Sequence, residues 1–192
     1  MAKLYFSYSA MNAGKSTGLL QASHNYRERG MNTLLLTASH YEVAGQTVIT
    51  SRLGIEVEAE KFAADTDLFA FIKEQEGMGA LHCVMVDEAQ FLSDDQVWQL
   101  ARVADELNIP VMTYGLRTDF QGNLFPGSLR LLAIADTIRE VKTICHCGSK
   151  ATMVARFTED GRLATEGDQV AVEKSKYMSY CRKHWARVMQ RY

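Results

Sequence analysis

Short apolar runs alternate with amphipathic segments along most of the chain. The apolar runs are predicted strands, and the middle ones are apolar enough to be buried on both faces; they cover residues 3–8, 32–38, 81–86, 109–114 and 136–141, with a shorter strand at 48–50. The amphipathic segments have apolar side chains at helical spacing and are predicted helices at residues 17–29, 66–76 and 93–107. This alternation predicts an α/β fold with a mostly parallel sheet and helices on both faces.

The pattern changes near residue 143, where cysteines, short alternating runs and turn residues replace the long periodic segments. A chain of 192 residues has room for one full-size domain and a small appendage. We therefore predict an α/β domain over residues 1–142 and a small second domain over residues 143–192.

Residues 9–16 read SAMNAGKS, between the first predicted strand and the first predicted helix. The stretch matches the phosphate-binding pattern G-x-x-x-x-G-K-[ST], except that Ser9 stands at the first glycine. Amides at a helix N-terminus can bind phosphate oxygens there. Gly14 would let the backbone come close, Lys15 would neutralise the β- and γ-phosphates, and Ser16 would bind Mg²⁺. The alternative is an ordinary strand–turn–helix junction with Lys15 at the surface.

An acidic pair, Asp87 and Glu88, follows the apolar run CVMV. In phosphate-loop enzymes an acid at the end of a neighbouring strand holds Mg²⁺, and we predict this role for Asp87. Glu88 points to another side and could take a proton from an attacking hydroxyl. The alternatives are a solvated acid pair before a turn, or the water-activating glutamate of a helicase-type ATPase.

Two close pairs of metal-binding residues lie in the small domain. They are Cys145 and Cys147 in C-H-C, and Cys181 and His184 in C-R-K-H. Four such ligands suit a tetrahedral Zn²⁺ with no open position, hence a structural site that would stabilise a region too small for a core of its own. His146 could compete as a ligand, and unrelated reduced cysteines are the alternative. Cys83 lies in an apolar run and is predicted to be a core residue.

The net charge of −2 gives no reason to expect a nucleic-acid partner. No apolar run approaches the ~18 residues of a membrane span, and the N-terminal residues lack the pattern of an export signal. These features predict a cytoplasmic protein without a membrane partner. In that compartment cysteines serve metal binding or chemistry rather than disulfides.

Taken together, the motifs resemble the cellular-type (type II) thymidine kinase family over essentially the whole chain. The stretches that carry the resemblance are YSAMNAGKST at 8–17, VDEAQF at 86–91, YGLRTDFQGNLFPGS at 114–128, KTICHCG at 142–148 and YMSYCRKH at 177–184. Bacterial members also have serine at the first loop glycine and a C-x-C zinc pair. The resemblance implies transfer of the γ-phosphate of ATP to the 5′-hydroxyl of thymidine, with Mg²⁺, by a P-loop (RecA-like) domain.

The family pattern also implies a site on the nucleotide side, with Glu88 as general base and Lys15 on the phosphates. Ser16 and Asp87 would hold Mg²⁺. The full set of implied ATP-binding residues is Ser9, Ala10, Met11, Asn12, Ala13, Gly14, Lys15, Ser16, Asp87, Glu88, Ala89 and Gln90. Two arginines, Arg52 in SRLG and Arg156 in MVAR, are catalytic candidates, and a solvated arginine is the alternative for each.

On the thymidine side, the resemblance implies that Phe120 stacks on the pyrimidine. It also implies that the loop before Tyr177, called the lasso, is anchored at the zinc site and closes over the substrate. The implied substrate-binding residues are Met11, Leu116, Phe120, Phe125, Val170, Val172 and Tyr177. Before Tyr177 many members have a V-x-I-G-G-type stretch, but this chain reads VAVEKSKY without the paired glycines. Glycine allows a backbone to approach a ligand closely, so this departure bears on pocket tightness and nucleoside preference.

The family is typically a homotetramer that thymidine triphosphate inhibits, so the resemblance implies both properties here. Two other functions remain open on the residues alone. A nucleic-acid-stimulated ATPase would use the same loop and acids to hydrolyse ATP. A zinc-ribbon binding module would use only the cysteine cluster.

Overall fold

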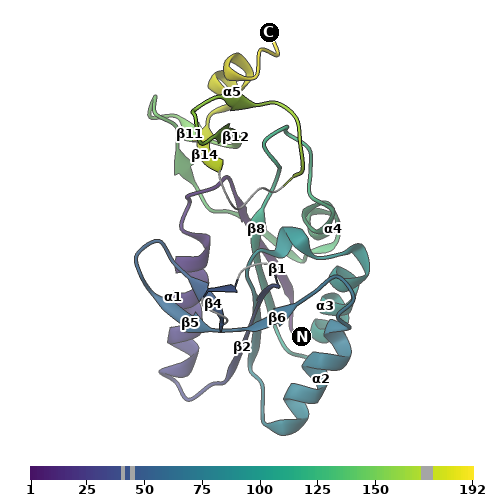
Figure 1. Cartoon of the computed structure of the whole chain (residues 1–192). Helices are drawn as coiled ribbons and strands as arrows, with labels where there is room; N and C mark the ends of the chain where they lie inside the picture. The colour runs from purple at the N-terminus through teal and green to yellow at the C-terminus, as the bar shows by residue number, and fades with distance from the viewer. Residues whose placement is uncertain (40–41, 44–45, 170–174) are drawn as a thin grey trace.

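We describe the protein from a computed structural model, which covers residues 1–39, 42–43, 46–169 and 175–192. The chain forms a large part built on one sheet and a small part at one end of it, which carries the C-terminus (Figure 1). Within these ranges, no helix is both long enough and apolar enough to cross a membrane.

The large part is built on a six-stranded sheet in which every neighbouring pair is parallel. The strands, in spatial order, are β6 (Glu60–Phe62), β2 (Thr33–Ala38), β7 (Cys83–Val86), β8 (Val111–Leu116), β1 (Leu4–Ser9) and β9 (Thr137–Glu140). This confirms the predicted parallel α/β sheet. Parallel strands end at the same edge of a sheet, so the segments that follow β1, β7 and β8 meet there.

Two features of the sheet differ from the sequence expectation. Strand β6 was not predicted, because it has only three residues and Phe62 is its one buried side chain. Strand β8 lies between β1 and β7. The strand that ends in the acidic pair, β7, is therefore not the direct neighbour of β1, the strand that precedes the loop. Strand order is not encoded in local periodicity, which is why the pattern could not reveal this.

Alternate residues of the central strands enter two separate cores. Leu34, Leu36 and Val84 belong to one hydrophobic cluster, whereas Leu35 and Met85 belong to the other. Successive side chains of a strand point to opposite faces, so both faces of the sheet are buried. The near-continuous apolar runs therefore follow from a sheet that is covered on both sides.

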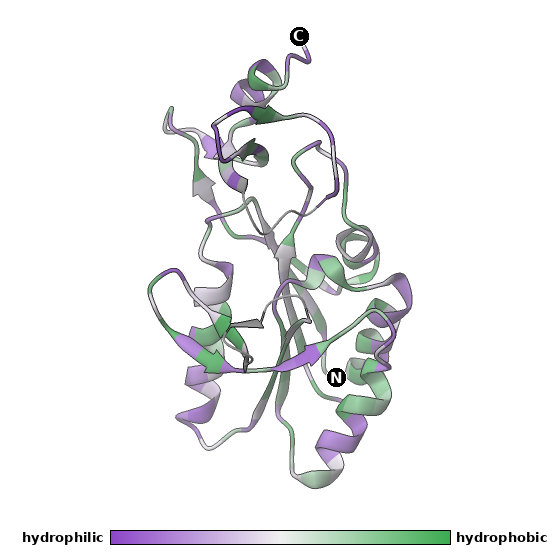
Figure 2. Cartoon of the chain, in the orientation of Figure 1, coloured by the Kyte–Doolittle hydropathy of each residue, from purple (hydrophilic) through white to green (hydrophobic). Residues whose placement is uncertain are grey.

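Helices cover the two faces (Figure 1). Helix α1 (Lys15–Arg27) packs in one core, through Leu19 and Leu20. The other core receives α2 (Leu68–Met78), α3 (Asp94–Glu106) and α4 (Pro126–Ile134). Both colours of the hydropathy scale occur on α1 and on α2, as expected for helices with one buried side (Figure 2).

The helix ends follow local chemistry. Ser93 and Gln96 form a capping box at the start of α3, as the predicted capping serine requires. Helix α4 was not predicted, although Pro126 stands in its first turn, where proline is favoured. A 3₁₀ turn, η1 (Ala89–Phe91), follows the acidic pair.

An extended hairpin of three antiparallel strands lies beside α1 and β2. It comprises β3 (Glu42–Val43), β4 (Gln46–Thr50) and β5 (Glu56–Glu58), all antiparallel, and the short strand predicted at 48–50 lies within β4. Ile49 of β4 is buried with Leu19 and Leu35, so the hairpin extends the core on that face.

The small part is antiparallel. A two-stranded hairpin pairs β10 (Thr143–Ile144) with β11 (Lys150–Ala151), and a three-stranded sheet has the order β13 (Leu163–Ala164), β12 (Met153–Thr158), β14 (Ser175–Tyr180), followed by α5 (Arg182–Val188). Its core is small and includes Trp185. The Trp185 indole donates to the carbonyls of Phe120 (3.2 Å) and Val154 (2.9 Å), so the small part is joined to the long loop after β8.

Candidate functional site

A cavity of about 520 Å³ opens at the carboxyl end of the sheet. The turn after β1 and the start of α1 line it from Met11 to Thr17, the turn after β4 lines it from Thr50 to Leu53, and Glu88 and Leu116 complete the wall. The cavity thus brings together Lys15 and Glu88, which are far apart in the sequence. Ligands commonly bind in such a crevice beyond the strand ends of an open parallel sheet.

Ser9 has a definite role at the position where the loop pattern has glycine. It is the last residue of β1, so its backbone is extended and needs no glycine. Its buried hydroxyl donates to the Ala10 carbonyl at 2.6 Å and accepts a hydrogen bond from the Lys15 ammonium at 3.0 Å. Lys15 also donates to the Ala10 carbonyl at 3.4 Å. The serine therefore orients the lysine at the start of the helix.

The turn itself contains two residues in the left-handed region. Gly14 has φ +83° and Asn12 has φ +64°. Gly14 precedes the first residue of α1 and contributes no side-chain cap. An added Cβ at Gly14 would meet nothing within 4 Å, so the backbone conformation, not crowding, favours glycine there. The uncapped amides of the first turn are thereby left to bind an anion.

Burial and the nearby carboxylates act on the pKa of Lys15 in opposite directions. Loss of hydration lowers the pKa of its ammonium, while Glu88 and then Asp87 act in the opposite direction. An ammonium held in this way, bonded to two neutral oxygens, has a strong electrostatic preference for an additional anionic ligand.

Asp87 is buried at the end of β7. Desolvation, followed by the neighbouring Glu88 charge, raises the pKa of its carboxyl to about 6, against hydrogen bonds from Ser16 and the Glu88 amide that lower it. The contact between Ser16 of the loop and Asp87 of the strand end joins the two residues predicted from the sequence to bind Mg²⁺. A hydroxyl and a carboxylate are oxygen donors of the kind that this hard cation prefers, so the pair fits the ion.

Glu88 is held in an unusual conformation. Its φ is +54°, which is uncommon for a residue other than glycine, and its amide donates to the Asp87 carboxylate at 3.0 Å. The side-chain amide of Gln90 makes both contacts: its Nε2 donates to the Glu88 carboxylate at 2.5 Å, and its Oε1 accepts from the Leu116 backbone amide at 2.9 Å. Gln90 therefore fixes the Glu88 side chain relative to β8. Strained backbone of this kind is concentrated at functional sites.

The remaining nucleotide-side candidates fall into two groups. Arg52 is exposed and lines the cavity, from the turn after β4. Ala89 and Gln90 are buried in η1 and are not among the residues that line the cavity. Thr50, Ser51 and Leu53 also line the cavity, although sequence reasoning assigned them no role. In the sequence, only the SRLG turn that contains Arg52 pointed to this segment. The contact of residues 50–53 with the cavity depends on how the hairpin packs on the sheet, which local sequence does not encode.

Arg156 lies elsewhere. It is buried on β12, and its guanidinium lies 3.9 Å from the centre of the Phe120 ring. It donates to the carbonyls of Asp168 (2.6 Å) and Glu166 (2.8 Å). Arg156 therefore links the backbone of 166–168 to the Phe120 ring. It is not among the residues that line the cavity around Lys15.

The other thymidine-side candidates are spread over the two parts. Leu116 and Met11 line the cavity. Phe125 is buried at the start of α4, in edge contact with Phe91. Tyr177 is half-buried on β14, opposite Arg156 of β12. The candidates Val170 and Val172 lie outside the described residues.

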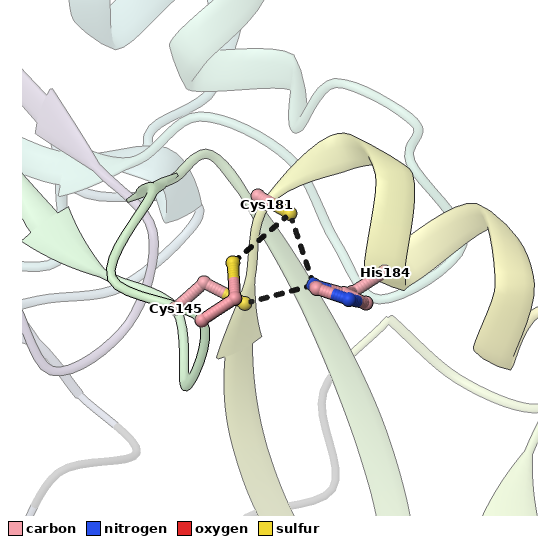
Figure 3. A group of neighbouring side chains, drawn as sticks. Cys145, Cys181 and His184 are labelled. Carbon is pink, nitrogen blue, oxygen red and sulfur yellow. Dashed lines mark hydrogen bonds between the residues drawn. The ribbon is translucent and has the colours of Figure 1, made fainter.

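The predicted metal ligands converge on one point. One ligand atom from each of Cys145, Cys147, Cys181 and His184 lies within 4.8 Å of all the others. Figure 3 shows Cys145, Cys181 and His184 facing one another. His184 Nδ1 is 3.6 Å from Cys145 Sγ and 3.3 Å from Cys181 Sγ, and the Sγ atoms of Cys147 and Cys181 are 4.0 Å apart.

These distances fit a tetrahedral zinc ion. Typical Zn–S and Zn–N bonds place two sulfur ligands about 3.8 Å apart and a sulfur and a nitrogen about 3.6 Å apart. Hydrogen bonds from Ser149 lower the pKa of the Cys147 thiol to about 6, which favours the thiolate that zinc binds. The competing candidate, His146, lies beside the His184 ring, with the centroids 4.4 Å apart and the planes tilted by 41°, but it is not one of the four converging residues. Cys83 is buried in β7, as predicted.

Comparison with known proteins agrees with the geometry. A family model described as thymidine kinase matches residues 2–185. A thymidine kinase of Mesorhizobium japonicum is 62% identical over 191 residues, which cover 100% of this chain and 94% of the relative. One of Agrobacterium fabrum is 61% identical, covering 96% of each chain. One of Idiomarina loihiensis is 55% identical, covering 98% of each chain.

Proposed function

The chain belongs to the thymidine kinase family, an ATP-dependent phosphotransferase family, and we propose that it transfers the γ-phosphate of ATP to the 5′-hydroxyl of thymidine. The product, thymidine monophosphate, would feed nucleotide salvage. The observation that carries this proposal is the shared cavity of Lys15 and Glu88, where an anion-binding loop and a carboxylate face the same space.

Phosphoryl transfer requires alignment and charge neutralisation more than covalent help. In our proposal the amides of residues 11–16 and the Lys15 ammonium bind the triphosphate. Ser16 and Asp87 would hold Mg²⁺, which neutralises charge on the β- and γ-phosphates when bound. Arg52, exposed at the cavity wall, would add a cation from the opposite side.

Glu88 would orient and deprotonate the 5′-hydroxyl for in-line attack on the γ-phosphorus. Two contacts support this role: Gln90 donates to the Glu88 carboxylate and holds the side chain, and the Glu88 amide donates to the Asp87 carboxylate, which holds the backbone. A base that is already positioned loses little freedom when the substrate binds. Gln90 would act as a positioning residue.

The pyrimidine would bind between the loop after β8 and the segment before Tyr177. Phe120 would stack on the base, with Leu116, Met11, Phe125, Val170, Val172 and Tyr177 around it. In this proposal Arg156 acts on the Phe120 ring rather than on phosphate, because its guanidinium is bonded to two backbone carbonyls. The lasso closing over the substrate would exclude water, which would otherwise hydrolyse ATP.

The Cys₃His cluster would hold a structural zinc, since all four positions of a tetrahedron are filled by protein. Three thiols can serve this site only when kept reduced, which supports a cytosolic location. Feedback inhibition by thymidine triphosphate and a homotetrameric assembly are parts of the proposal that rest on the family alone.

One assay separates this function from its rivals: labelled ATP with a panel of nucleosides, with and without nucleic acid. The expected result is labelled thymidine monophosphate, formed at a rate that nucleic acid does not change. Free phosphate released faster with DNA or RNA, without a phosphorylated nucleoside, would support the ATPase instead. A binding module would give no turnover, and its partner binding would survive Lys15→Ala.

A further inference from the structure

Two hydroxyls of the small part contact the carbonyls of the phosphate loop. Ser179 of β14 donates to the Met11 carbonyl at 2.6 Å, and Thr143 of β10 donates to the Asn12 carbonyl at 3.4 Å. The residues in these pairs are separated by 168 and 131 positions. The first is a short, partly buried bond, and the second is long and exposed.

These bonds decide which way the loop amides point. A trans peptide places its C=O and the following N–H on opposite sides. When Ser179 binds the Met11 carbonyl, the Asn12 amide is aimed away from β14, and Thr143 has the same effect on the Ala13 amide. Met11, Asn12 and Ala13 all line the cavity. The two hydroxyls therefore favour the peptide orientation in which amides, not carbonyls, are available to an anion.

The loop needs such support because its conformation is costly. Asn12 has φ +64°, and a residue other than glycine in this region persists only when its surroundings hold it. The hydroxyls of the small part provide part of that constraint. Without them the 11–12 and 12–13 peptides could rotate and present carbonyl oxygens to the phosphates.

Both hydroxyls also stand two residues before a zinc-cluster cysteine. Thr143 precedes Cys145 in the first pair, and Ser179 precedes Cys181 in the second. A metal bound to both cysteines holds these two segments at a fixed separation, and with them the two hydroxyls. The pairing of β14 with β12 over six residues extends the same rigidity to Ser179.

We propose that Ser179, assisted by Thr143, is a positioning residue for the nucleotide site, and that through it the metal cluster raises the affinity of the phosphate loop for ATP. The inference rests on the proposed function, because it assumes that the loop binds ATP. It assigns the cluster an effect on the nucleotide in addition to the stability of the small part.

The first test measures the dissociation constant of a non-hydrolysable ATP analogue by calorimetry. Ser179→Ala is expected to weaken binding about three- to tenfold, as for loss of one hydrogen bond, and Thr143→Val less. Ser179→Thr, which keeps the hydroxyl, should restore most of the affinity. Glu159→Ala, an exposed change in the turn after β12, is the control and should bind as the wild type does. In kinetics, KM for ATP should rise while kcat at saturating ATP and KM for thymidine stay near wild type.

The second test removes zinc with a chelator and repeats the binding measurement, with circular dichroism to confirm that the parallel sheet remains folded. Chelation should weaken ATP binding in the wild type and have a clearly smaller effect in the Ser179→Ala/Thr143→Val double variant, because that variant has already lost the connection. A wild type that binds no ATP would overturn the proposed function and this inference together. A wild type that binds ATP, with Ser179→Ala or chelated protein binding equally well, would overturn the inference alone.

Discussion

The cavity around Lys15 and the cluster around Cys145 lie in one chain but are held in place in different ways. The cavity is at the edge of a six-stranded sheet with a buried core on each face, so packing positions its residues. The cluster lies in a region whose core is one small group of side chains that includes Trp185. Such a region gains order from metal coordination. Burial therefore positions the residues of the cavity, whereas the part that would cover the cavity would depend on metal coordination.

The largest effect should come from the cluster. Cys145→Ser replaces a buried cysteine, one of the four proposed zinc ligands, by a residue whose hydroxyl binds zinc poorly. Structural zinc contributes about 10 kcal/mol or more to the folding of small domains, so residues 143–192 should lose their fold. Limited proteolysis should then cleave within that range while the sheet stays intact, and elemental analysis should find almost no zinc. Cys83→Ala, in the core strand β7, is the control and should keep about one zinc per chain. Full zinc in Cys145→Ser would contradict the ligand assignment.

Glu88→Gln should break the chemistry while leaving the architecture unchanged. The amide can keep its hydrogen bond with Gln90 but cannot accept a proton, so turnover should fall about 10²- to 10⁴-fold with ATP binding nearly unchanged. Steady-state rates and ATP calorimetry measure the two effects. Glu74→Gln, an exposed change on α2, is the matched control and should be fully active. Near-normal turnover of Glu88→Gln would remove the base assignment.

The pKa of Asp87 gives a test of the Mg²⁺ site. Because burial raises this pKa to about 6 from 3.8, the metal-free folded protein holds more protons than the unfolded chain between these values. The contribution of Asp87 to stability is therefore most favourable at low pH and is lost as the pH rises through 6.

Mg²⁺ must displace that proton at low pH. With a nucleotide analogue present, its affinity should fall about tenfold per unit below about pH 6 and level off above it. Calorimetric titration of Mg²⁺ over this range is the measurement. Asp87→Asn should bind Mg²⁺ weakly at every pH, without the dependence. A wild-type affinity that does not change with pH would show that Asp87 does not have to lose a proton near pH 6 to bind Mg²⁺.

The smallest effect should come from Ser9→Gly, which restores the usual loop pattern. Ser9 binds the Lys15 ammonium in the free protein, but phosphate oxygens would take over that ammonium in the complex. We therefore expect the ATP dissociation constant to change by no more than about threefold, which is under ~1 kcal/mol. A loss of more than about tenfold would mean that Ser9 keeps orienting Lys15 when the nucleotide is bound.

Features encoded in a few neighbouring residues were predictable from the sequence. The alternation of strands and helices, the loop ending in Gly14, Lys15 and Ser16, and the two metal-ligand pairs each depend on local spacing. Hydrophobic periodicity predicts a parallel sheet because a strand buried on both faces must be apolar throughout. The sheet confirms the predicted fold class, and the four converging side chains confirm that the two ligand pairs meet. The binding role of the loop stays a prediction.

What the chain determined by itself is therefore the chemistry available at each point. Tertiary structure alone decided which points meet: β8 between the two functional strands, Gln90 across to the Leu116 amide, Arg156 on the Phe120 ring, and Ser179 on the Met11 carbonyl. The physical reason is range. Periodicity and turn chemistry act over a few residues, whereas strand order and contacts between distant segments are set by the packing of the whole chain.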